Sequence, residues 1–117
     1  MAVQGYRAER LADQIRTEVA EIISGELKDP RIGLVTVTGV EMTGDLRHVR
    51  VSVSVLGNVE AQQKSLEGLT SATGYVRHEL SLRLPLRRAP ELTFVLDHAA
   101  EENARLETLL QKLKDEH

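Results

Sequence analysis

The residue types that most often carry enzyme chemistry are scattered through this sequence. It contains no cysteine, which excludes thiolate catalysis, a thiolate metal site and a disulfide framework. No HExxH, paired-carboxylate, glycine-elbow, Walker or GxGxxG pattern is present to organise a metal, a nucleophile or a nucleotide. The histidines stand too far apart for a local ligand motif; they are His48, His78, His98 and His117. We therefore expect no enzyme activity, no cofactor and no metal, and keep a small hydrolase only as a formal alternative.

The distribution of charge leaves nucleic acid open as a partner. The net charge is −3, but residues 1–96 carry twelve basic and twelve acidic side chains, whereas residues 97–117 carry three basic and six acidic ones. Within the neutral part, residues 74–90 hold four arginines and a single glutamate. A local excess of positive charge of this kind suits phosphate groups. These arginines are Arg77, Arg83, Arg87 and Arg88.

Arg87 and Arg88 are the favoured candidates for phosphate contact. They stand next to each other in a short linker between Pro85 and Pro90. Such a linker offers no packing reason for adjacent arginines, so we interpret them as contacts to a nucleic-acid backbone.

The other arginines can be interpreted in two ways. Arg77 and Arg83 fall on a predicted helix and could be ordinary solvated charges, because most helical charges are. For Arg7 and Arg10, in the first predicted helix, the sequence favours phosphate contact and an ordinary solvated charge equally. We expect Tyr75 to belong to the core rather than to stack on a base, since the chain has only three aromatic residues.

The hydrophobic pattern predicts the elements that must position these arginines. Apolar residues at helical spacing alternate along the chain with Val-rich and Thr-rich stretches typical of strands. A short turn joins the first two strands, which makes them antiparallel. The predicted elements are a helix over about 6–27, strands over 34–42 and 49–55, helical spacing over 58–84, a strand over 91–96, and a C-terminal helix carrying Leu106, Leu109, Leu110 and Leu113.

The helical stretch 58–84 is too long to be one straight helix in a domain of this size, since it would reach about 40 Å. We predict a break at Gly74, because glycine weakens a helix interior, and Gly68 is the other candidate. Gly74 either shapes a binding surface at a kink or fills a position where two elements pack closely. In both cases we expect Gly74→Ala to destabilise the domain.

This order of elements predicts an α+β domain whose mixed three-stranded sheet carries helices on one face. We assign residues 1–96 to that domain and residues 97–117 to a C-terminal helix that packs on it or extends from it. The leucines of this last helix are expected to be buried, so truncation after Leu96 should lower stability.

The same order, helix, strand, strand, helix, helix, strand, is that of the type II KH domain, an RNA-binding module. The GxxG clamp of KH domains is absent, because no two glycines here stand three residues apart. In its place stands Ala72-Thr73-Gly74, and this AxG kink resembles that of the ribosome-binding factor A family. The resemblance extends over nearly the whole chain through Arg7 to Arg10, Lys28-Asp29-Pro30-Arg31, Val35-Thr36-Val37-Thr38, Gly44-Asp45-Leu46-Arg47, Gly74-Tyr75-Val76-Arg77 and Pro90-Glu91-Leu92-Thr93-Phe94.

The resemblance implies a bacterial assembly factor and not an enzyme. Such a factor binds the free small ribosomal subunit during late maturation, assists processing at the 5′ end of its ribosomal RNA, and matters most at low temperature. The partner would be that subunit and its RNA, contacted mainly at phosphates, with no small-molecule substrate. The RNA-binding candidates are Arg7, Arg10, Arg77, Arg83, Arg87 and Arg88, and the interhelical kink is Ala72, Thr73 and Gly74.

We expect a cytoplasmic monomer, because the first residues lack the apolar core of a signal peptide and no stretch resembles a membrane span. The alternative function is a protein-interaction module that docks through the leucines of the C-terminal helix. Ionic strength separates the two, since phosphate contacts weaken steeply with salt and leucine contacts hardly respond.

Overall fold

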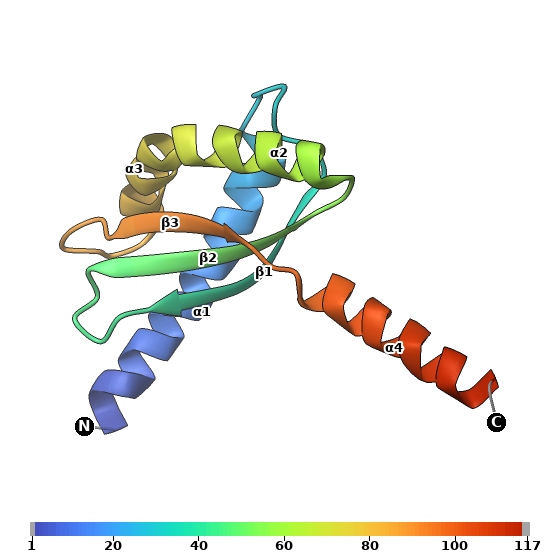
Figure 1. Cartoon of the computed structure of the whole chain (residues 1–117). Helices are drawn as coiled ribbons and strands as arrows, with labels where there is room; N and C mark the ends of the chain where they lie inside the picture. The colour runs from blue at the N-terminus through green and yellow to red at the C-terminus, as the bar shows by residue number, and fades with distance from the viewer. Residues whose placement is uncertain (1, 116–117) are drawn as a thin grey trace.

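The predicted elements and their order are confirmed. The computed structural model describes the backbone of residues 2–115 and the side chains of residues 7–98 and 106–115. The fold is α+β, as expected (Figure 1). Its elements are α1 (Ala2–Gly25), β1 (Val35–Met42), β2 (His48–Val55), α2 (Val59–Ser71), α3 (Thr73–Arg83), β3 (Glu91–Leu96) and α4 (Ala99–Asp115).

The three strands form the mixed sheet that the sequence predicted. The strand order is β1-β2-β3, with β1 antiparallel to β2 and β2 parallel to β3. Along β2 the four valines are buried, whereas His48 and Arg50 are exposed. One face of the sheet is therefore apolar and packs against the helices, and the other is polar.

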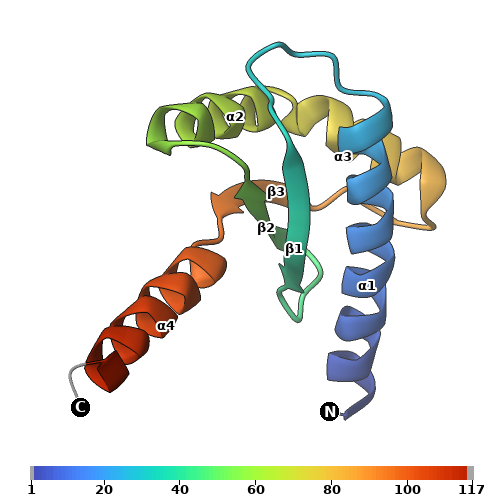
Figure 2. The ribbon, with the colours of Figure 1, turned by 90° about the vertical axis from the view of Figure 1, so that its right-hand side faces the viewer.

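The core lies between that apolar face and helices α1, α2 and α3. Ile15 and Ile22 of α1, Leu69 of α2 and Leu80 of α3 are completely buried against the valines of β2. Figure 2 shows α1 beside β1, whereas α2 and α3 lie next to β3. This packing makes one body from the first six elements.

The long helical stretch is broken at Ala72, which lies within the predicted kink of residues 72–74 but two residues before Gly74. Ala72 caps the end of α2 and leaves helical geometry, while its N–H donates to the carbonyl oxygens of Gly68 and Leu69. Gly74 lies in the first turn of α3, has no positive φ, and has open space where a Cβ would be. Our expectation that Gly74 is strained or closely packed is therefore wrong.

Gly68, the other candidate break, has a different function inside α2. A Cβ built on Gly68 would lie 2.6 Å from Cγ1 of Ile32, so only glycine lets this loop lie against the helix. The buried Ser65 completes the contact, because its Oγ accepts a hydrogen bond from the Gly33 N–H at 3.0 Å. The loop after α1 is thereby fixed on α2.

Helix α4 extends away from the body (Figures 1 and 2). Its four leucine side chains are about half exposed, so the expectation that they are buried is wrong for the isolated chain. The helix follows β3 directly, and no apolar surface of the described residues packs over its leucine face. The division of the chain at residue 96 stays a prediction. The exposed side chains are Leu106, Leu109, Leu110 and Leu113.

Candidate nucleic-acid interface

Three segments that are distant in sequence line one groove of about 490 Å³. They are the N-terminal part of α1, the turn between β1 and β2, and the linker between α3 and β3, which all lie at the left of the sheet in Figure 1. The parallel pairing of β2 with β3 brings the turn and the linker together, because both strands begin at the same end of the sheet. The Glu91 N–H also donates to the Arg47 carbonyl oxygen at 2.8 Å and so joins the linker to the turn.

Positive charge dominates the groove. Of its lining residues in the described part of the chain, four are arginines and one, Asp45, is acidic. The four guanidinium groups are exposed, and none makes a salt bridge or hydrogen bond with another described side chain. They are thus available to an anionic partner. These arginines are Arg7, Arg47, Arg87 and Arg88.

The carboxylate of Asp45 is already engaged by the turn itself. Its Oδ1 accepts hydrogen bonds from the Thr43 hydroxyl at 2.6 Å and from the Arg47 N–H at 3.1 Å. These two bonds hold the pKa of Asp45 below its usual value, and the bond from Thr43 has the larger effect. Asp45 therefore stays ionised and orders the turn instead of pairing with a guanidinium group.

Arg77, a predicted RNA contact, is directed toward its own chain. Its Nε donates to the Pro90 carbonyl oxygen at 2.9 Å, and its Nη2 donates to the Ala89 carbonyl oxygen at 3.0 Å. The guanidinium group therefore caps the end of the arginine linker. These two bonds fix the backbone directly after Arg87 and Arg88.

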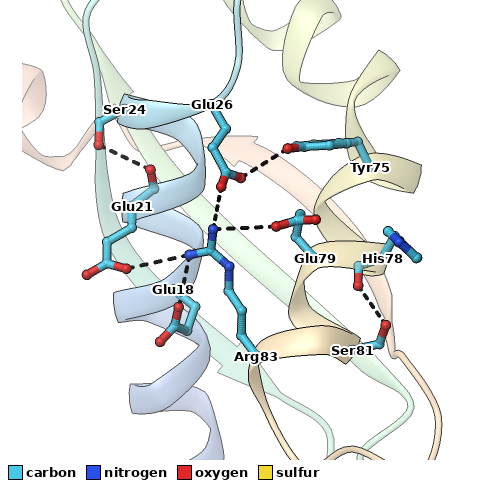
Figure 3. Close-up of polar contacts among 9 residues, drawn as sticks. All are labelled: Glu18, Glu21, Ser24, Glu26, Tyr75, His78, Glu79, Ser81 and Arg83. Atoms are coloured by element: carbon cyan, nitrogen blue, oxygen red, sulfur yellow. Dashed lines mark hydrogen bonds and ion pairs between the residues drawn. The ribbon is translucent and has the colours of Figure 1, made fainter.

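Arg83 is surrounded by carboxylates (Figure 3). Its Nη1 lies 3.2 Å from Glu18 Oε2, and its contacts with Glu21 and Glu26 join α3 to the end of α1. The hydrogen bond with Glu18 is the largest cause of a raised Arg83 pKa. A guanidinium group held in this way has little capacity for phosphate, so we leave Arg83 out of the proposal below. Its partners are Glu18, Glu21, Glu26 and Glu79.

Tyr75 is an exposed neighbour of this cluster and not a core residue, contrary to our expectation. Its side chain is 45% exposed, and its hydroxyl donates to Glu26 Oε2 at 3.1 Å. Partial burial and this bond raise the pKa of the hydroxyl. The side chain links α3 to the end of α1.

Arg10 and Arg47 differ in their relation to the groove. Arg10 is exposed on α1 but does not line the groove. Arg47 does line it, and our sequence reasoning did not select it as a site residue. A signal was present, since Arg47 directly precedes β2 and Arg87 and Arg88 precede β3, so parallel pairing of these strands would have placed all three at one end of the sheet.

Among the described residues, no group of three or more histidine, aspartate and glutamate side chains could hold a metal ion. His48 and His78 lie on β2 and α3 and His98 follows β3, while His117 lies outside the described residues. None of the described helices is long and apolar enough to cross a membrane.

Comparison with known proteins identifies the family. A family model described as Ribosome-binding factor A matches residues 7–110, which is most of the chain. The chain belongs to the ribosome-binding factor A family. Ribosome-binding factor A of Natranaerobius thermophilus is 43% identical over 111 residues, which cover 95% of this chain and 85% of that protein. The same factor of Caldanaerobacter subterraneus subsp. tengcongensis is 42% identical over 109 residues, 92% of this chain and 89% of that protein.

Solved structures of the ribosome-binding factor A family share this fold. The crystal structure of the Thermus thermophilus factor has a TM-score of 0.71 and 29% identity, covering 79% of this chain and 97% of that one. A homology model of the Thermus thermophilus factor, fitted into a cryo-electron-microscopy map of a 30S complex, has a TM-score of 0.64 and 31% identity, covering 76% and 93%. The KH-like fold expected from the order of elements is therefore confirmed.

Proposed function

We propose that this chain is a cytoplasmic, monomeric assembly factor that binds the free small ribosomal subunit through phosphates of its ribosomal RNA. It then assists late maturation of that subunit, including processing at the 5′ end of the RNA, and is needed most at low temperature. It acts by binding and catalyses no reaction. The expected partners follow from its family, one member of which has been fitted into a map of a 30S complex.

The groove carries the proposal. Phosphate oxygens prefer guanidinium groups, and four unpaired ones converge here from three segments of the chain. Contacts of this kind fix the position of a protein on RNA without reading its sequence. We therefore assign the main phosphate contacts to Arg7, Arg47, Arg87 and Arg88, and we keep Arg10 as a further candidate because it is exposed on the same helix as Arg7.

Sedimentation tests the function directly. We expect the protein to sediment with isolated small subunits and not with large subunits or assembled ribosomes. Replacing Arg87 and Arg88 together by alanine should weaken this binding and reduce the slope of log affinity against log salt by roughly 1.4 to 1.8, at about 0.7 to 0.9 per lost contact. An unchanged slope would remove the linker from the interface.

A matched control removes the same charge elsewhere. Lys112 and Lys114 are exposed on α4, far along the chain from the groove. The double alanine variant of these lysines has the same net charge as the double arginine variant. We expect it to keep the wild-type salt slope, because general loss of positive charge is not what weakens binding.

The exposed leucines of α4 support a second candidate function, docking on a protein partner. Such binding would depend on apolar area and would hardly change with ionic strength. A complex that survives high salt and is lost when Leu109 and Leu110 are replaced by serine would favour this candidate over phosphate contact.

A further inference from the structure

Half of the residues that line the arginine groove are apolar. They are two prolines and three leucines, of which Leu11 and Leu86 pack against the hydrophobic core. The side chains of these leucines are half-buried, so each presents one side to the groove. A site that bound only phosphates would gain nothing from this surface. The apolar residues are Leu11, Leu46, Pro85, Leu86 and Pro90.

The two forms of RNA differ in what they offer to such a groove. A duplex presents phosphates and ribose on its outside and keeps the faces of its bases stacked within. An unpaired strand can turn a base outward and place its apolar face on a protein surface while its phosphates remain on basic side chains. A groove of about 490 Å³ is also within the range of pockets that enclose a single small ligand.

Building on the proposed function, we propose that the groove binds an unpaired RNA segment, with one base on the leucine surface and the flanking phosphates on the arginines. The base lies against Leu11, Leu46 and Leu86. This goes beyond phosphate contact, because it predicts a preference for single strands that charge alone does not supply.

The backbone of Leu46 supports this assignment. Its φ of 63° lies in the left-handed region, which leucine rarely adopts. The turn maintains this conformation, since the Leu46 N–H donates to the Thr43 carbonyl oxygen at 2.9 Å and the Arg47 N–H donates to Asp45. Strained positions of this kind concentrate where a ligand is held. The turn that maintains this conformation contributes both Leu46 and Arg47 to the lining of the groove.

Binding of three labelled RNAs with equal numbers of phosphates tests the proposal, with fluorescence anisotropy as the measurement. The probes are an unpaired uridine oligonucleotide, the same strand with abasic positions in its centre, and a fully paired duplex. We expect the full chain to bind the uridine strand about fivefold more tightly than either of the others, because only that strand can cover the leucines. Equal affinity for all three probes would overturn the inference.

A variant of Leu46 separates the base contact from the charge. Asparagine tolerates the left-handed conformation and removes the apolar side chain, so Leu46→Asn should keep the fold. We expect it to lose the preference for the uridine strand and to retain the salt slope. Leu56→Asn is the control, because Leu56 is 73% exposed and lines no part of this groove. A Leu46→Asn protein that keeps the full preference would contradict the assignment.

The two proposals fail differently. A protein that follows the small subunit in sedimentation but does not discriminate among the RNAs retains the proposed function and loses the base contact. A protein that discriminates among the RNAs but does not follow the small subunit retains the base contact and loses the proposed function.

Discussion

The guanidinium group of Arg77 holds the backbone of Pro90, with Nε donating to the Pro90 carbonyl oxygen at 2.9 Å. Arg77 belongs to α3, the helix after the break, and Pro90 ends the linker that carries Arg87 and Arg88. The direction of α3 and the position of the two linker arginines are therefore coupled. An arginine that the sequence predicted to contact RNA thus donates to the backbone directly after two other predicted contacts.

Arg77→Ala should destabilise the domain by about 1.5 to 3 kcal/mol, because two hydrogen bonds from a charged donor are lost at a half-buried position. Its RNA affinity should fall with the salt slope unchanged, because we assign the Arg77 guanidinium group to the Ala89 and Pro90 carbonyl oxygens and not to phosphate. Urea unfolding and salt titration of RNA binding measure the two effects. A slope reduced by about 0.7 to 0.9 would instead show a direct contact.

Arg83→Ala should lower the unfolding midpoint clearly, because four carboxylates that share one guanidinium group would then repel one another. The control is Arg50→Ala, which breaks a single exposed pair with Glu41 and should change stability little. Thermal unfolding at low and high salt compares them. High salt should bring the two unfolding midpoints closer together, because it screens the repulsion. If the difference in midpoint stays the same at high salt, repulsion among the carboxylates is not the cause of the lower midpoint of Arg83→Ala.

Alanine at the two glycines of the broken helix should have opposite effects. Gly74→Ala should stabilise by about 0.5 to 1 kcal/mol, because the residue is helical with open space at Cβ. Gly68→Ala should destabilise by about 1 to 3 kcal/mol, because the new methyl group would collide with Ile32. Denaturant unfolding of both variants checks this pair. Destabilisation by Gly74→Ala would restore our original view of that residue.

Truncation after Leu96 should leave the thermal midpoint of the remaining domain nearly unchanged. The leucines of α4 are about half exposed, so their removal takes little apolar area out of the folded state. Differential scanning calorimetry of the full and shortened chains measures the effect. A fall of many degrees would mean that α4 packs on the body in solution, as the sequence pattern first indicated.

Acid should weaken the turn that carries Arg47. The pKa of Asp45 is lowered by folding, so its contribution to stability is complete above the ordinary carboxyl value and is lost as the pH falls through the lowered pKa. Between about pH 6 and pH 3, the wild type should therefore lose more stability than Asp45→Asn, in which this carboxylate is absent. Unfolding midpoints of both proteins, measured across this pH range, show whether the wild type loses more stability than Asp45→Asn. Parallel curves would show that Asp45 makes no such contribution.

The sequence alone determined the elements and the architecture of the sheet. The four valines at alternate positions of β2 predict one apolar face of the sheet. The short turn predicts that β1 and β2 are antiparallel. The N-cap at Asn58 is equally local, since its side chain accepts from the Ala61 N–H, three residues further on, at 2.9 Å. These features depend on periodicity and on neighbours a few residues away, which a linear pattern records.

The surroundings of each arginine depend on contacts that form only when the chain folds. Arg77 and Arg87 stand ten positions apart in the same basic stretch, yet one binds carbonyl oxygens of its own chain and the other faces solvent in the groove. The difference depends on which carboxylates and carbonyl groups lie within about 3 Å after folding, and those come from distant segments. For the same reason Arg47 joined the groove only when β2 paired with β3, and the leucines of α4 proved exposed because no described element of the body lies over them. Charge and periodicity specify a side chain's chemistry and its helix face, but its partner is set by packing between elements.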